Sequence, residues 1–156
     1  MEAAGRQALA GLTQAPLGEF ESMAGATAGI LLVEDEAFVR HVTCEVLEAA
    51  GYRVFKARNA REAVTTFREN SIEIQLLLTD VVLPGQSGRE LAQQLRHLKA
   101  GLKTIFVSGY PKNGKGTKGI AGVSFLEKPF SSEGLLRKVR EVLSPEDLAR
   151  QAAAGG

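Results

Sequence analysis

Five short apolar runs alternate with helical stripes along this chain, and this order constrains the fold more than any other feature. The first run, 30–33, stops at Glu34, and the third, 74–79, stops at Asp80. Continuous apolar runs of this length are typical of strands that are buried on both faces. The other predicted strands are 52–57, 104–107 and 123–126. Strands that alternate with helices pair in parallel through right-handed crossovers, so we predict an open three-layer α/β sandwich.

Apolar side chains at helical spacing fill the intervals between the strands. The first stripe ends before Gly51, a predicted helix stop, and consists of Phe38, Val39, Val42, Val46, Leu47 and Ala50. The other stripes lie at 60–67, where Asn59 is the predicted N-cap, at 91–98 and at 135–143. We place His41 and His97 on polar helix faces and Cys44 on the flank of the first stripe. None of these three residues is expected to carry phosphotransfer or redox chemistry.

Length and composition limit what this chain can be. Its 156 residues suffice for one ordinary domain, which we place at 29–144 between a tail or linker at 1–28 and a short extension at 145–156. The 19 basic and 18 acidic residues leave a net charge of +1, too little to attract nucleic acid or an anionic membrane directly. The apolar runs are too short to span a bilayer, and one cysteine forms no internal disulfide. We therefore expect a cytoplasmic protein without direct nucleic-acid or membrane contact.

Polar side chains stand at the carboxyl ends of four predicted strands. Glu34 and Asp35 follow the first strand, Asp80 the third, Ser108 the fourth and Lys128 the fifth. Parallel strands bring these ends to one edge of the sheet, where open α/β folds bind ligands. Carboxylates held this close repel one another unless a cation neutralises them, and a ligand set made only of oxygens suits Mg²⁺. A lysine and a hydroxyl beside them would hold phosphoryl oxygens, so the sequence predicts phosphoryl transfer to a carboxylate.

The residues around these strand ends form four blocks, which are Val33-Glu34-Asp35-Glu36; Leu78-Thr79-Asp80 with Leu83-Pro84-Gly85 and Gly88; Phe106-Val107-Ser108-Gly109-Tyr110; and Leu126-Glu127-Lys128-Pro129-Phe130. In order and spacing they resemble the receiver domain of two-component response regulators over residues 29–144. The last two blocks are most similar to the C-terminal receivers of hybrid sensor histidine kinases. The resemblance implies a doubly wound five-stranded parallel sheet of order 2-1-3-4-5. It also implies an aspartate that is phosphorylated from a kinase phosphohistidine with Mg²⁺.

The resemblance assigns a role to each matching acidic position. It implies that Asp80 is the phosphoacceptor, that Asp35 is a direct Mg²⁺ ligand and that Glu34 holds the metal partly through water. The backbone carbonyl of Val82 would complete the protein's share of the coordination. The implied partners are a sensor histidine kinase or a histidine phosphotransfer protein, together with a downstream protein. The implied activity is self-phosphotransfer and self-dephosphorylation, without turnover of another substrate.

The remaining family positions concern the phosphoryl oxygens and the signalling switch. Ser108 would hydrogen-bond one oxygen, Lys128 would pair with another, and the peptide from Lys128 to Pro129 would be cis. Phe125 occupies the aromatic switch position, where it lacks the hydroxyl of the more usual tyrosine. Tyr110 is placed where it influences water access to the phosphoryl group. The pair Gln86-Ser87 replaces the Met-Asp of many receivers, which we interpret as a changed helix N-cap.

Three other functions share a feature with this sequence. The segment 109–115 reads like a nucleotide-binding P-loop, but Gly116 stands where that motif needs a hydroxyl. An aspartyl-phosphate phosphatase would need a second acid two residues after Asp80, and that position is Val82. A pseudo-receiver that binds a partner without phosphorylation would be expected to lack part of the chemical set, which is complete here.

The interval between the last two predicted strands departs from the family. Five glycines and Pro111 lie within 109–122. Each interior glycine costs a helix about 1 kcal/mol relative to alanine. We therefore expect the fourth helix of the family to be absent or short, with a basic loop in its place.

Overall fold

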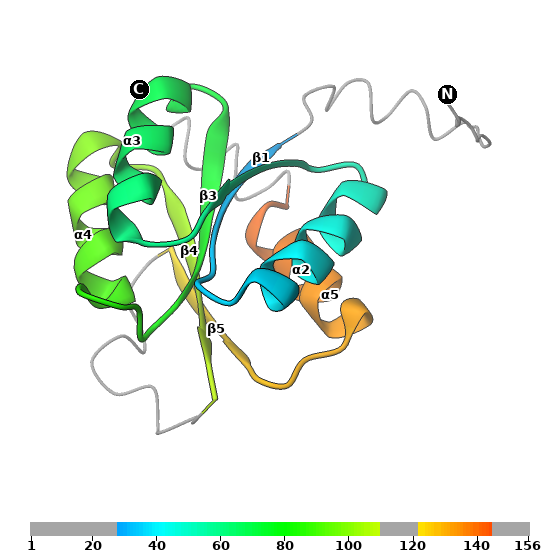
Figure 1. The fold of residues 1–156 in the computed structure, drawn as a ribbon. Coiled ribbons are helices and arrows are strands. Elements are labelled where there is room, and N and C mark those ends of the chain that lie inside the picture. The colour runs from blue at the N-terminus through cyan, green and yellow to red at the C-terminus, as the bar shows by residue number, and fades with distance from the viewer. Residues whose placement is uncertain (1–27, 110–121, 145–156) are drawn as a thin grey trace.

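The computed structural model describes residues 28–109 and 122–144, to which all structural statements below refer. The helices and strands, labelled as in Figure 1, are β1 (Gly29–Val33), α2 (Ala37–Ala49), β2 (Arg53–Ala57), α3 (Ala60–Asn70), β3 (Ile74–Asp80), α4 (Gly88–Leu98), β4 (Lys103–Ser108), β5 (Val123–Glu127) and α5 (Ser132–Val142). The strands form one parallel sheet of order β2-β1-β3-β4-β5. This confirms the predicted fold class and the strand order that the family resemblance implied.

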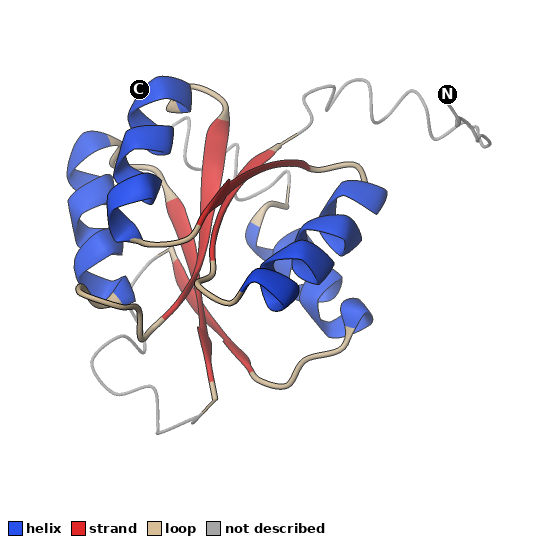
Figure 2. Ribbon diagram, in the orientation of Figure 1, coloured by secondary structure: helices blue, strands red, loops and turns tan. Residues whose placement is uncertain are grey.

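Helices cover both faces of the sheet, which gives three layers (Figures 1 and 2). Alternate residues of β1 serve the two sides: Leu31 and Val33 belong to the core beneath α3 and α4, and Ile30 and Leu32 to the core beneath α2 and α5. All four side chains are buried, as expected for a strand covered on both faces. The chain therefore uses its longest apolar runs to build two cores on one sheet.

Three predicted helix signals are found in the structure. The side chain of Asn59 accepts a hydrogen bond from the Glu62 amide at 2.8 Å and caps α3. Ser87 caps α4 in a reciprocal box with Glu90, so the changed N-cap is confirmed. Gly51, with φ of +101°, follows the end of α2, where residues with a Cβ are strained.

The predicted inner face of α2 was partly wrong. Phe38 is 73 % exposed and Val42 is also exposed, whereas Cys44, predicted on the flank, is only 4 % exposed. The helix buries Thr43, Cys44 and Leu47, so its contact face is rotated relative to the predicted stripe. A helical wheel treats all apolar residues alike when it predicts the buried face. The first turn of α2 lies at the end of the sheet, where Phe38 has no core to enter. His41 and His97 are exposed, as predicted.

Several predictions concern residues outside the described ranges. They are the tail over nearly all of 1–28, the missing or short fourth helix, the position of Tyr110, most of the P-loop-like segment and the extension at 145–156. Within residues 28–109 and 122–144, no helix has both the length and the apolar character needed to cross a membrane.

Candidate functional site

Main-chain hydrogen bonds hold the carboxyl ends of three neighbouring strands together. The Val81 amide donates to the Val107 carbonyl at 3.1 Å, which continues the ladder between β3 and β4. The Lys128 amide donates to the Ser108 carbonyl at 2.8 Å, directly after β5. The sheet thereby places Asp80, Ser108 and Lys128 at one edge.

Gly88 lets the start of α4 come close to Asp80. Its amide donates to the Val81 carbonyl at 2.7 Å, and a Cβ at this position would lie 2.0 Å from the Asp80 carbonyl oxygen. Because that contact is with backbone, no larger residue fits without moving the chain. The glycine eight residues after Asp80 is therefore required by packing beside the acid.

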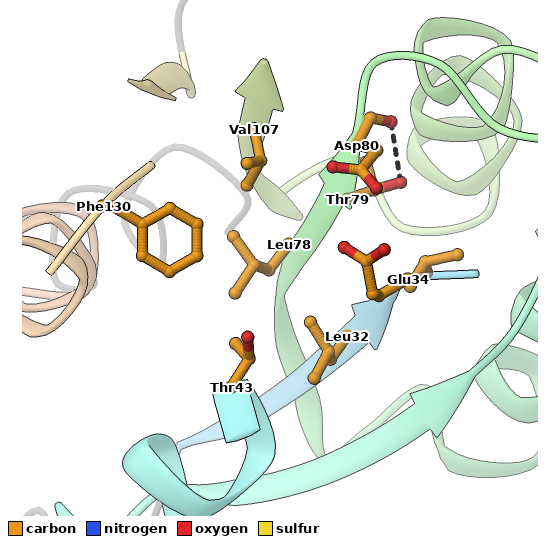
Figure 3. A pocket seen from close by; sticks show the side chains of 9 residues that line it. Leu32, Glu34, Thr43, Leu78, Thr79, Asp80, Val107 and Phe130 are labelled. Atoms are coloured by element: carbon orange, nitrogen blue, oxygen red, sulfur yellow. Dashed lines mark hydrogen bonds between the residues drawn. The ribbon is translucent and has the colours of Figure 1, made fainter. Parts of the chain in front are cut away.

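Three acids converge at this edge, as the sequence predicted. One carboxylate oxygen from each of Glu34, Asp35 and Asp80 lies within 4.8 Å of the other two. Glu34 is 6 % exposed and Asp80 is 8 % exposed, whereas Asp35 is open to solvent. Figure 3 shows the carboxylates of Glu34 and Asp80 pointing toward each other. The cluster thus has a buried side and one accessible member.

Lys128 is the cation that faces this cluster. Its Nζ lies 3.1 Å from Asp80 Oδ1 and 3.6 Å from Glu34 Oε1. Burial favours the neutral amine, but the hydrogen bond and charge of Asp80, with the charge of Glu34, outweigh it, so the pKa of Lys128 is raised. The peptide from Lys128 to Pro129 is cis, as the family resemblance implied.

One lysine leaves the cluster with an excess of negative charge. Burial, followed by the charge of Asp80, raises the pKa of Glu34 to about 7, although its Oε2 also accepts a hydrogen bond from the Glu36 amide. This carboxyl therefore holds its proton to a higher pH than an ordinary glutamate does. A bound divalent cation would remove that repulsion.

The ligand set fits Mg²⁺ in its chemistry. All three side chains offer hard oxygen donors, which Mg²⁺ prefers, and the open position of Asp35 leaves room for the waters that this ion retains. Among residues 28–109 and 122–144, Glu34, Asp35 and Asp80 form the one group of three or more acids, histidines or cysteines whose ligand atoms are close enough to share an ion.

The remaining predicted site residues lie around the acids. Ser108 ends β4, and Val82 is exposed in the loop that follows β3. Phe125 is half-buried and packs against Phe106, with ring centroids 5.6 Å apart. These positions agree with the predicted roles without testing them.

Sequence reasoning missed the apolar floor of the site. A small pocket beneath Glu34 and Asp80 is lined by Leu32, Thr43, Leu78, Val107 and Phe130 among others (Figure 3). This floor explains why the two carboxylates lose so much water. Strand alternation could have identified Leu32 and Leu78. Phe130 belongs to the fourth sequence block, but nothing there pointed to this floor, and Thr43 of α2 carried no signal at all.

Arg40 was also missed. Its Nη1 donates a hydrogen bond of 2.7 Å to the carbonyl oxygen of Glu34, which links α2 back to the acidic end of β1. An arginine on a helix face is ordinarily a solvated residue, so nothing in the sequence singles it out.

Comparisons with known proteins identify relatives of this arrangement. Residues 30–140 match the response regulator receiver domain family. The chain is similar to the sensor kinase CckA of Brucella abortus (strain 2308), with 37 % identity over 123 residues that cover 78 % of this chain and 13 % of that kinase. It is 32 % identical over 116 residues to the response regulator receiver protein CpdR of the same strain, covering 73 % of this chain and 95 % of that protein. It spans about half the length of other curated regulators that it matches.

Solved structures agree with these matches. The receiver domain of the hybrid histidine kinase CckA superposes with a TM-score of 0.67 and 36 % identity, covering 75 % of this chain and 100 % of that domain. The response regulator TrrA of Thermotoga maritima, solved in complex with Mg²⁺-BeF, has a TM-score of 0.65 and 29 % identity, covering 74 % of this chain and 99 % of that one.

Proposed function

Since this chain belongs to the response regulator receiver domain family, and is thus a phosphoacceptor of two-component signalling, we propose that Asp80 is the residue that carries the phosphoryl group. Asp80 is supported over the other acids because, within the acidic cluster, it makes the shortest contact with Lys128, at 3.1 Å against 3.6 Å for Glu34. The complete set of acids and lysine also argues against a module that works without phosphorylation.

In this proposal the Asp80 carboxylate is the nucleophile. One of its oxygens forms a bond to the phosphorus of a partner's phosphohistidine, the N–P bond breaks, and the imidazole recovers its proton from solvent. Lys128 and Ser108 hold the phosphoryl oxygens as negative charge is transferred. Later attack by water on the phosphorus breaks the bond to the carboxylate oxygen, releases inorganic phosphate and returns Asp80 to its free state, so the protein turns over no separate substrate.

Receiver domains bind Mg²⁺ at an acidic site, and we assign that role here to the acids described above. Asp35, Asp80 and the Val82 carbonyl would hold the ion directly, and Glu34 would hold it through water. When bound, Mg²⁺ supplies positive charge that offsets the repulsion between the carboxylates and an incoming phosphoryl group.

Receiver domains interact with histidine kinases and phosphotransfer proteins, and we propose that such a donor docks around this site. Two large apolar side chains next to the acids support this: Phe38 lies three residues after Asp35, and the exposed Val82 lies two after Asp80. Movement of Ser108 and Phe125 on phosphorylation would pass the signal to a downstream protein. The single cysteine supports a cytoplasmic location.

The assignment of Asp80 is tested with a small phosphodonor. Wild-type protein incubated with acetyl phosphate and Mg²⁺ should gain the mass of one phosphoryl group, and Asp80→Asn should gain none. Glu69→Gln, which neutralises an exposed acid on α3, is the control and should behave as wild type. Wild-type levels of phosphorylation in Asp80→Asn would disprove the assignment.

A further inference from the structure

The connection from β1 to α2 is held in an unusual way. Glu36 is the N-cap of α2, yet its side chain makes no capping hydrogen bond. The Glu36 amide instead donates to Glu34 Oε2 at 3.1 Å, so a carboxylate of the acidic cluster serves the start of the helix. The loop that carries Glu34 and Asp35 therefore lacks the independent cap that holds α3, α4 and α5.

Arg40 supplies the missing anchor. It lies in the second turn of α2, and its guanidinium reaches back to the Glu34 carbonyl at 2.7 Å. A charged donor at this distance makes a strong hydrogen bond. The carbonyl belongs to the peptide that joins Glu34 to Asp35, so fixing it fixes the plane of that peptide. The position of the Asp35 Cα is then set as well, and only rotation about its N–Cα bond remains to direct the side chain.

Arg40 is also within electrostatic range of Glu62 on α3. The pKa of Glu62 is lowered mainly by hydrogen bonds from Arg58, with a smaller contribution from the charge of Arg40. Glu62 is itself held by Arg58, whose Nε and Nη2 lie 3.0 Å and 2.9 Å from its Oε2. The charge of Arg40 is thus partly balanced by that of Glu62, and within the described part of the chain its one hydrogen bond to another element of the site is the bond to the Glu34 carbonyl.

We propose that Arg40 is a positioning residue for the magnesium site, which it prepares by holding the peptide between Glu34 and Asp35. This inference rests on the proposed function, because it presupposes that these acids bind Mg²⁺. Arg40 contacts no predicted ligand oxygen of the ion, and acts only through the backbone of the two acids.

The direction in which Mg²⁺ affinity changes when Arg40 is neutralised separates this role from simple electrostatics. As a mere positive charge near the site, Arg40 would repel Mg²⁺, and its removal would tighten binding. As an anchor of the loop, its removal leaves the peptide free to rotate, and Mg²⁺ must then order it at an entropic cost. The positioning role therefore predicts weaker binding after neutralisation.

The test is the dissociation constant for Mg²⁺, measured by isothermal titration calorimetry on the full chain. Arg40→Gln should raise the dissociation constant about tenfold, and Arg40→Lys should lie between Arg40→Gln and wild type. The control Arg137→Gln removes an exposed charge from α5 and should leave the constant unchanged. At saturating Mg²⁺, phosphorylation of Arg40→Gln by acetyl phosphate should recover the wild-type rate, because only preparation of the site was lost.

Each outcome bears on one proposal. An unchanged or lower dissociation constant in Arg40→Gln overturns the positioning role. If that variant does not fold, Arg40→Lys decides, and an unchanged constant there overturns the role. Hydrogen exchange without metal gives a second readout, since the Glu36 amide, which donates to Glu34 Oε2, should exchange faster in Arg40→Gln. Absence of Mg²⁺ binding in the wild type would instead refute the proposed function.

Discussion

Two partly buried lysines lie at opposite ends of the strands of the same sheet. Lys99 lies at the amino ends, called the amino edge here, and Lys128 at the carboxyl ends, the carboxyl edge, and their surroundings differ. Lys99, after α4, donates to the Ser71 and Ile74 carbonyls, both at 2.7 Å. Lys128, after β5, faces the carboxylates of Asp80 and Glu34. Burial lowers the pKa of Lys99, whereas the acids raise that of Lys128 in spite of its burial.

The difference separates stabilisation from chemistry. Lys99 ties the end of α3 and the start of β3 to α4 through neutral carbonyl dipoles, which need no further partner. At the other edge three acids meet one lysine, so the folded protein retains an electrostatic conflict that lowers its stability. Such conflicts persist where function requires them. We therefore interpret the amino edge as a stabilising region and the carboxyl edge as the reactive one.

Exchanging each lysine for glutamine gives the largest expected contrast. Loss of one charged donor to a developing phosphoryl charge costs about 10²–10³ in rate, so Lys128→Gln should slow phosphorylation by acetyl phosphate by that factor. Lys99→Gln should leave this rate unchanged at a temperature where it is folded. Phosphorylation followed by intact mass over time measures both. A rate for Lys128→Gln within about threefold of wild type would contradict the division between the edges.

The electrostatic conflict also predicts how stability depends on pH. Glu34 has a pKa of about 7 in the folded protein against 4.5 ordinarily, so its contribution to stability is full below 4.5 and is lost as pH rises through 7. Without Mg²⁺ this should lower the free energy of unfolding by roughly 3 kcal/mol between pH 4.5 and 8, relative to Glu34→Gln. Urea titrations of both proteins measure the difference. Mg²⁺ should stabilise the wild type more as pH rises, and equal pH profiles would refute the conflict.

The sequence predicted the reactive edge better than the packing of the helices. Glu34, Asp80 and Lys128 were found because strand ends of a parallel sheet must meet, whatever the details of packing. The face of α2 was partly wrong because Phe38 and Cys44 differ in position relative to the sheet, which a helical wheel does not contain. The bond from Arg40 to the Glu34 carbonyl depends on a side-chain conformation, and periodicity carries no information about that.

Removing the anchor at the amino edge should affect stability alone. Lys99→Met keeps the apolar length of the side chain but leaves the Ser71 and Ile74 carbonyls without this donor. An unsatisfied buried carbonyl costs about 1–3 kcal/mol, and since both sites are only partly buried we expect a loss of about 2 kcal/mol in total. Urea unfolding gives this value, with Arg68→Met, which changes an exposed side chain in the last turn of α3, as the surface control. An unchanged midpoint would show that Lys99 is not an anchor.

The smallest expected effect compares exposed apolar side chains at the two edges. Phe38 lies beside the acids at 73 % exposure, and Ile72 precedes β3 at the amino edge at 89 % exposure. With a histidine kinase core chosen because it phosphorylates the wild type, Phe38→Ala should weaken transfer roughly fivefold, about 1 kcal/mol of docking energy. Ile72→Ala should have no effect, and neither variant should change phosphorylation by acetyl phosphate, which needs no docking surface. Kinetics at varied receiver concentration should show that Phe38→Ala raises KM and leaves kcat unchanged. An equal loss in Ile72→Ala would mean that the donor does not distinguish the two edges, and the docking site proposed around Phe38 would then be wrong.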